Sequence, residues 1–120
     1  MKKIYVIHST AFDYVKNLYT PLKNISEFEF IFPHEEGNDS KNSTELIRSC
    51  DIVLAEVSYP STGSGIEIGR AECLNIPIVA IYKNGSNASS SIKFVTNNFL
   101  EYDDLGKDLD KIKSIISNIK

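Results

Sequence analysis

The stretch from Pro60 to Glu72, PSTGSGIEIGRAE, combines residue types that could do chemistry at one place in the chain. Hydroxyl side chains come first, and Gly63 and Gly65 would let a ligand approach the backbone closely. Glu67 follows in the first turn of a predicted helix, where the helix dipole favours an ionised carboxylate. A carboxylate held there can act as a nucleophile or stabilise positive charge at a sugar carbon.

The same residues also have a purely structural interpretation. Ser64-Gly65-Ile66-Glu67 fits the Ser-x-x-Glu capping box, in which Ser64 caps the helix and Glu67 reaches back to the N–H of Ser64. Glu67 could also pair with Arg70 one turn further on. From the residues alone, cap and catalyst both remain open for Glu67.

Strands and helices alternate along the chain, which predicts how this stretch is positioned. Apolar, β-branched runs predict strands over 4–8, 28–32, 51–57, 78–82 and 99–102. Helical spacing or turn signals predict helices over 12–22, around 46–47, over 64–74 and 92–97, and over 105–119. We therefore expect an α/β fold, a single domain over 1–120: a three-layer, doubly wound, flavodoxin-like five-stranded parallel sheet with helices on both faces.

Ligands of such sheets bind outside the carboxyl ends of the strands, at the switch point of the strand order. The loops after His8, Pro33, Val57 and Tyr82 should therefore surround one site. In the first of these loops, His8, Ser9 and Asp13 are candidate substrate contacts. His8 has a competing interpretation as a histidine whose hydrogen bonds are satisfied at the sheet end.

Composition excludes several classes of partner. The net charge of -3 offers no electrostatic basis for binding a nucleic acid polymer or an anionic membrane. The first apolar run ends at His8, too early for a signal peptide or a membrane span. Cys50 and Cys73 are expected to be buried free thiols, and we expect a cytoplasmic location. The two histidines show no metal-ligand spacing, so we predict neither a metal nor a cofactor.

The run DIVLAEVSYPSTGSGIEIGRA, from Asp51 to Ala71, resembles the nucleoside 2-deoxyribosyltransferase-like family. It is most similar to the branch of 2'-deoxynucleoside 5'-monophosphate N-glycosidases, whose pattern is Ala-Glu-Val followed by Pro-Ser-x-Gly-x-Gly-x-Glu-x-Gly-x-Ala. The resemblance implies that Glu67 attacks C1' of the sugar and forms a covalent glycosyl intermediate as the base leaves. Water or a second base then completes hydrolysis or transfer.

The resemblance also implies roles for two serines. Ser61 matches the motif serine that binds the 5' end of the nucleotide. A serine from a neighbouring subunit often completes that site, and within Ser89–Ser91 the register favours Ser89. The expected partners are thus a small-molecule nucleoside or nucleotide and a second copy of the chain, in a homodimer with a shared site.

Two departures from the family pattern leave other functions open. Ser43 stands where the family carries an aspartate that handles the base, with Asp39 or Glu45 as substitutes. The loop over 8–14 lacks the arginine that the hydrolase branch has there. The alternatives to an N-glycosidase or deoxyribosyltransferase are a catalytically inactive nucleotide-binding or sensing module and a ribonucleotide phosphoribohydrolase-like enzyme.

Overall fold

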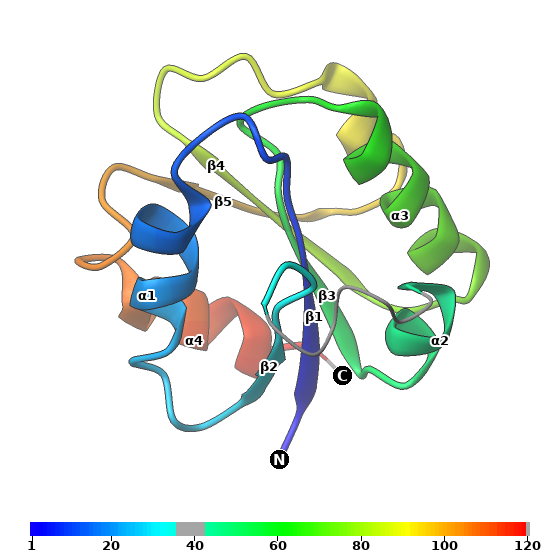
Figure 1. Cartoon of the computed structure of the whole chain (residues 1–120), viewed down its shortest axis with the longest axis horizontal. Helices are drawn as coiled ribbons and strands as arrows, with labels where there is room; N and C mark the ends of the chain where they lie inside the picture. Colours follow the sequence, from blue (N-terminus) through cyan, green and yellow to red (C-terminus); the bar gives the residue numbers. More distant parts are fainter. Residues whose placement is uncertain (36–42, 120) are drawn as a thin grey trace.

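Five parallel strands form one sheet in the order β2-β1-β3-β4-β5 in the computed structural model, which describes residues 1–35 and 43–119 (Figure 1). The strands are β1 (Lys3–Ile7), β2 (Glu29–Ile31), β3 (Ile52–Glu56), β4 (Ile78–Lys83) and β5 (Asn98–Tyr102). This is the predicted flavodoxin-like order, and each predicted strand lies within one residue of the observed one at either end.

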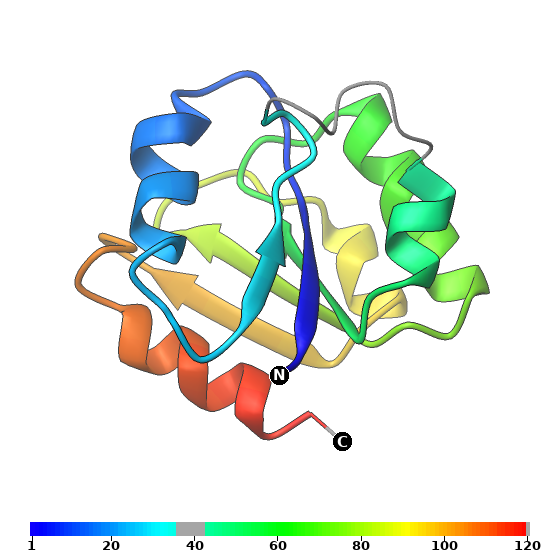
Figure 2. The same cartoon turned by 60° about the horizontal axis from the view of Figure 1, so that its bottom comes forward.

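Helices cover both faces of the sheet, as the alternating pattern predicts (Figure 2). In chain order they are the π-helix η1 (Val15–Tyr19), α1 (Thr20–Leu22), α2 (Ser43–Arg48), α3 (Thr62–Cys73), the 3₁₀-helix η2 (Ser90–Phe94) and α4 (Leu109–Ser117). η1, α1 and α4 lie on one face, and α2, α3 and η2 lie on the other. The confirmed fold is therefore a three-layer α/β sandwich.

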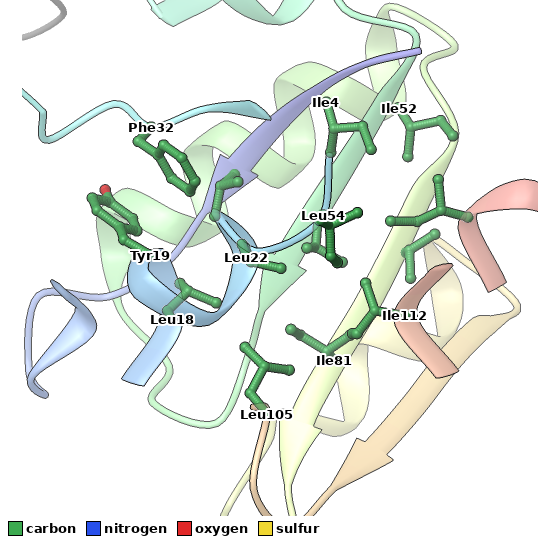
Figure 3. Packing of buried hydrophobic residues seen from close by; sticks show 14 of the residues in the cluster. Ile4, Leu18, Tyr19, Leu22, Phe32, Ile52, Leu54, Ile81, Leu105 and Ile112 are labelled. Carbon is green, nitrogen blue, oxygen red and sulfur yellow. The ribbon is translucent and has the colours of Figure 1, made fainter. Parts of the chain in front are cut away.

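Side chains of each strand alternate between two cores because successive residues of a strand point to opposite faces. Leu54 and Ile81 pack with Leu18 and Ile112 in the core beneath η1, α1 and α4 (Figure 3). Tyr5, Val53, Ala55 and Ala80 belong to the core beneath α2, α3 and η2. For β1 this alternation sends Tyr5 toward α3.

The helix α3 has well-formed ends. At its start Ser61 has an extended backbone, and its hydroxyl accepts a hydrogen bond from the N–H of Ser64. At its end Asn75 adopts a left-handed φ of 58°, while the N–H groups of Asn75 and Ile76 donate to the carbonyls of Glu72 and Ala71. This is the Schellman motif, in which asparagine is a common alternative to glycine.

Two expectations need correction. The helix over 12–22 is not a regular α-helix, because it begins as η1 with the N–H of Thr20 bonded to the carbonyl of Val15 five residues back. Pro21 then falls in the first turn of α1, where its missing N–H costs little. Both cysteines are free, but Cys73 is exposed on α3 whereas Cys50 is buried.

No helix in the described part of the chain is both long and apolar enough to cross a lipid bilayer.

The central strand β3 should carry a large share of the stability. Leu54 is fully buried, so truncating it in L54A leaves a cavity and should lower the free energy of unfolding by about 2–5 kcal/mol in urea titrations. The matched control is F94A, because Phe94 is 81% exposed and its loss should change stability by less than about 0.5 kcal/mol. Equal effects of the two variants would contradict this account of the core.

Candidate active site

A cavity of about 680 Å³ opens at the carboxyl ends of β1 and β3. Its walls come from the loop after β1, from Pro33 and His34 after β2, from α2, and from the first three turns of α3. Chain connections leave β1 and β3 toward opposite edges of the sheet, so this is the switch point at which a ligand site is expected. The loop after β4 lies elsewhere and lines a separate hollow with Tyr59, which corrects the prediction that all four loops surround one site.

Glu67 lies in this cavity and is half-buried. The hydroxyl of Tyr5 donates a hydrogen bond to Oε2 of Glu67, with 2.5 Å between the oxygens. Burial, together with this bond, raises the pKa of Tyr5 far above its usual value, so the phenol remains a donor. The structure thus gives the Glu67 carboxylate a defined orientation, and no residue in the described part of the chain has a hydrogen bond to Oε1.

The capping box predicted at Ser64 is wrong. Ser61, three residues earlier, is the N-cap, and Ser64 is already inside the helix with its hydroxyl 2.7 Å from that of Ser61. Glu67 is therefore in the second turn of α3 and bonds to Tyr5 in place of the N–H of Ser64. The capping interpretation of Glu67 is therefore wrong, and its carboxylate has Tyr5 as a partner.

One face of α3 runs along the cavity. Gly63, Glu67 and Arg70 follow the i, i+4, i+7 spacing that places side chains above one another on a helix. A Cβ added to Gly63 would meet no heavy atom within 4 Å, so packing within the protein does not require a glycine at this position. A ligand in the cavity could use the open backbone there.

Two of the predicted contacts face a second cavity. Gly65 and Ser89 line a hollow of about 300 Å³ between α3 and η2, separated from the first by Ser61 and Ser64, which line both. The hydroxyl of Ser89 accepts a hydrogen bond from the N–H of Ser91 and caps η2. Within one chain, Ser89 and Gly65 therefore do not share the cavity of Glu67.

The two other candidates in the loop after β1, Ser9 and Asp13, also lie in different places. Ser9 is buried and lines the cavity of Glu67, and its hydroxyl accepts from the N–H of Ala11. Asp13 is not among the described residues that line this cavity, and its carboxylate accepts from the N–H of Lys16 at the start of η1. The loop thus places Ser9 in the site and Asp13 at a helix start.

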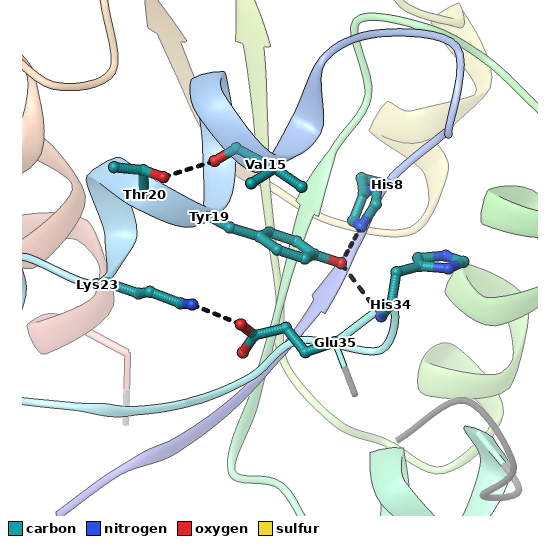
Figure 4. A network of polar contacts seen from close by, with 7 residues as sticks. All are labelled: His8, Val15, Tyr19, Thr20, Lys23, His34 and Glu35. Carbon is teal, nitrogen blue, oxygen red and sulfur yellow. Dashed lines mark hydrogen bonds and ion pairs between the residues drawn. The ribbon is translucent and has the colours of Figure 1, made fainter. Parts of the chain in front are cut away.

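His8 lines the cavity but has both ring nitrogens engaged, and Figure 4 shows the bond to Tyr19. Nδ1 lies 2.8 Å from the carbonyl oxygen of Ser9, which can only accept, so Nδ1 carries the proton. Nε2 then accepts from the hydroxyl of Tyr19 at 2.5 Å, and that hydroxyl accepts from the N–H of His34. These bonds favour the structural interpretation of His8 as a histidine satisfied at the sheet end.

Sequence reasoning missed the roles of two residues of the site, Tyr5 and Arg70. Tyr5 gave one available signal, because a tyrosine in a buried strand needs a partner for its hydroxyl. Arg70 lines the cavity, and its Nη1 donates to the hydroxyl of Ser43 at 2.6 Å. Asp39, named as a substitute for the missing aspartate, lies outside the described residues, whereas Glu45 pairs with Arg48 at 2.6 Å on exposed surface.

Within residues 1–35 and 43–119, no group of three or more His, Cys, Asp and Glu side chains comes together as a possible metal site.

The fold and cavity define a flavodoxin-like α/β domain with a carboxylate at its switch point, and comparisons with known proteins add names. No family model matches the chain. The chain is 42% identical over 67 residues to a Syntrophotalea carbinolica protein named "Putative 2'-deoxynucleoside 5'-phosphate N-hydrolase 1". The aligned part covers 53% of this chain and 47% of that protein. The chain is 46% identical over 37 residues to the 5-hydroxymethyl-dUMP N-hydrolase of Mus musculus, covering 31% and 21% of the two chains.

These similarities confirm the resemblance found in the sequence, although the matches span less than half the length of either relative. Among solved structures, the Clostridium botulinum CMP N-glycosidase BcmB has a TM-score of 0.67 and 22% identity, with 93% of this chain and 99% of that chain covered. A pilus assembly-related protein of Burkholderia pseudomallei follows with a TM-score of 0.63 and 14% identity, covering 100% of this chain and 92% of that one. At such identities the likeness shows the fold, and one fold serves many functions.

Burial should hold His8 in its neutral form. Loss of hydration is the main cause that lowers the pKa of His8 below its usual value of about 6.5; the Ser9 carbonyl opposes it and the nearby His34 adds to it. In an H34Q variant His8 is the only histidine, so its imidazole resonances should titrate with a midpoint below 6.5.

The direction in which His8 makes the stability depend on pH follows from how many protons the folded and unfolded chains bind at this side chain. Below pH 6.5 the unfolded chain binds more protons at this position than the folded chain, so the contribution of His8 is complete above pH 6.5 and is lost as pH falls. Burial raises the pKa of Glu56, so the contribution of Glu56 to stability changes with pH in the opposite direction. Because the measured stability combines both groups, the NMR titration of His8 is the direct measurement. A midpoint above 6.5 would contradict the neutral Nδ1–H assignment.

Proposed function

We propose that this protein cleaves or transfers the N-glycosidic bond of a (deoxy)nucleoside or its 5'-monophosphate, with Glu67 as the nucleophile. The observation that carries the proposal is the Glu67 carboxylate, oriented by the Tyr5 hydroxyl inside the cavity at the switch point. The names of the two sequence relatives, both N-hydrolases, support the same bond. The reaction class is therefore hydrolysis or glycosyl transfer in nucleotide metabolism.

The proposed reaction has two displacements at C1'. In the first, Oε1 of Glu67 attacks C1' while the C1'–N bond breaks and its electron pair departs with the base. In the second, water or a second base attacks C1', and the Glu67 carboxylate is released. Tyr5 donates to Oε2 throughout and so fixes which oxygen faces the sugar.

The 5' end of the substrate is proposed to lie at the start of α3. Free N–H groups at a helix N-terminus attract anions, and Gly63 leaves them accessible from the cavity. Ser61 and Ser9 add hydroxyls on the same side. We further propose that two copies associate, so that Ser89 of each copy, which lies apart from its own Glu67, completes the site of the other.

A nucleotide-binding module without turnover is the second candidate. Ser43 favours it, because a hydroxyl bonded to Arg70 cannot act as the acid that an aspartate would be. Such a module would be stabilised increasingly, with the logarithm of nucleotide concentration above its Kd, and would form no product.

Removal of the nucleophile separates the two candidates. We expect E67Q to lower base release from a panel of nucleosides and 5'-monophosphates on the order of 10³-fold or more, measured by chromatography of the free base. The matched control is E72Q, an exposed glutamate of the same helix, which should keep full activity. Nucleotide binding without base release by the native chain would favour the binding module, and an E67Q variant that remains active would exclude Glu67 as nucleophile.

Substitution of Gly63 tests whether the substrate lies close to the backbone at the start of α3, and it changes no charge. Alanine fits without contact and is a better helix former, so G63A should raise the free energy of unfolding by about 0.5–1 kcal/mol. Its methyl group would extend into the cavity, so the same variant should raise KM. G69A, in the same helix and equally free of contacts, should gain stability with unchanged kinetics. Unchanged kinetics in G63A would place the substrate elsewhere.

A further inference from the structure

Arg70 is the only lysine or arginine among the described residues that line the cavity of Glu67. The chain has one other arginine, Arg48, which pairs with Glu45 on exposed surface at 2.6 Å. Arg70 differs because its partner among residues 1–35 and 43–119 is a neutral hydroxyl, that of Ser43 at 2.6 Å. An aspartate at position 43 would neutralise the guanidinium, whereas Ser43 orients it and leaves its positive charge in place.

The position of Arg70 along α3 indicates which part of a substrate it meets. Glu67 lies about 6 Å from Gly63 along the helix axis, and Arg70 about 4.5 Å beyond Glu67, at a rise of 1.5 Å per residue. If C1' is at Glu67 and the 5' end is at the start of α3, the base must extend toward Arg70. Leu46 and Ile66 also line this cavity and offer apolar surface to the faces of a base.

The departing base needs charge stabilisation when the C1'–N bond breaks. Its ring nitrogen takes the electron pair, and in a uracil-type base the negative charge spreads to the carbonyl oxygens. A guanidinium cannot give up a proton at neutral pH, but it can donate hydrogen bonds to such oxygens. The departing anion then takes a proton from water, which balances the proton released when water attacks the glycosyl intermediate.

We propose that Arg70, held by Ser43, is a catalytic residue that stabilises the departing base as an anion, in place of an acid that would protonate it. This inference rests on the proposed N-glycosidase function and names how that site handles its leaving group. It gives the chain a preference for bases that leave as anions, such as 2,4-dioxopyrimidines, over bases such as adenine that need protonation.

The test is a leaving-group comparison with R70Q. With 2'-deoxyuridine 5'-monophosphate, R70Q should lower kcat about 10- to 100-fold, less than the loss of a fully buried donor because Arg70 is exposed to solvent. With the 5-fluoro analogue, whose base is more acidic and leaves more readily, the loss should shrink to a few-fold. R70K keeps the charge but loses the planar fork and should fall between native and R70Q.

The controls separate this role from a structural one. R48Q removes the other arginine, outside the cavity, and should match the native chain with both substrates. Thermal unfolding of R70Q and R70K shows whether each variant is folded, and R70K keeps the test available if R70Q is not. E67Q should be inactive with both substrates, because a better leaving group does not replace a nucleophile.

Other outcomes would overturn the proposal, and they separate failure of the role of Arg70 from failure of the N-glycosidase function. Equal losses with the uracil and 5-fluorouracil substrates would overturn leaving-group stabilisation by Arg70 and leave the N-glycosidase function standing. A native chain that releases adenine but neither uracil base would do the same. A native chain that releases no base from any substrate would overturn the proposed function, and the role of Arg70 with it.

Discussion

The adjacency of β1 and β3 in the middle of the sheet is the constraint on which the rest of the structure depends. Because the chain leaves these two strands toward opposite edges, their carboxyl ends have no connection crossing above them, and a cavity forms there. The same pairing places Tyr5 of β1 under α3, the helix that follows β3. The Tyr5–Glu67 bond is thus a consequence of strand order as much as of the two side chains.

The motif contains two glutamates, and their environments give them different roles. Glu56, at the end of β3, is 1% exposed and accepts hydrogen bonds from the N–H and hydroxyl of Ser58 and from the hydroxyl of Tyr102. Burial raises the pKa of Glu56, and these donors oppose that rise. Both of its oxygens accept hydrogen bonds within the fold, so Glu56 ties β3 to β5, whereas Glu67 lines the cavity and bonds to Tyr5 through Oε2. Accessibility and partners separate the structural acid from the candidate nucleophile.

Local patterns predicted the sheet well because each buried parallel strand is a continuous apolar run bounded by polar or turn residues. The start of α3 was harder, since Ser61 and Ser64 are three residues apart and either hydroxyl could cap a helix. The exposure of Cys73 was also not predicted, because a cysteine on a helix gives little indication of which face of the helix it occupies. The two bonds that shape the site, Tyr5–Glu67 and Arg70–Ser43, join residues 62 and 27 positions apart. Such pairs follow from the packed fold and leave no local signal in one sequence.

The fold alone does not select a chemistry, since the pilus assembly-related protein superposes on this chain nearly as well as the CMP N-glycosidase does. The chemistry of this chain has to be argued from the groups on α3: a capped N-terminus, an open glycine, a held carboxylate and a held guanidinium. The resemblance implies an aspartate at position 43, and a serine there keeps a hydrogen bond to Arg70 while changing the charge that Arg70 presents. A site with one oriented anion and one oriented cation can meet both the positive charge that develops at C1' and the negative charge that leaves with the base. The departure at position 43 is therefore consistent with a different way of handling the leaving group as well as with lost activity.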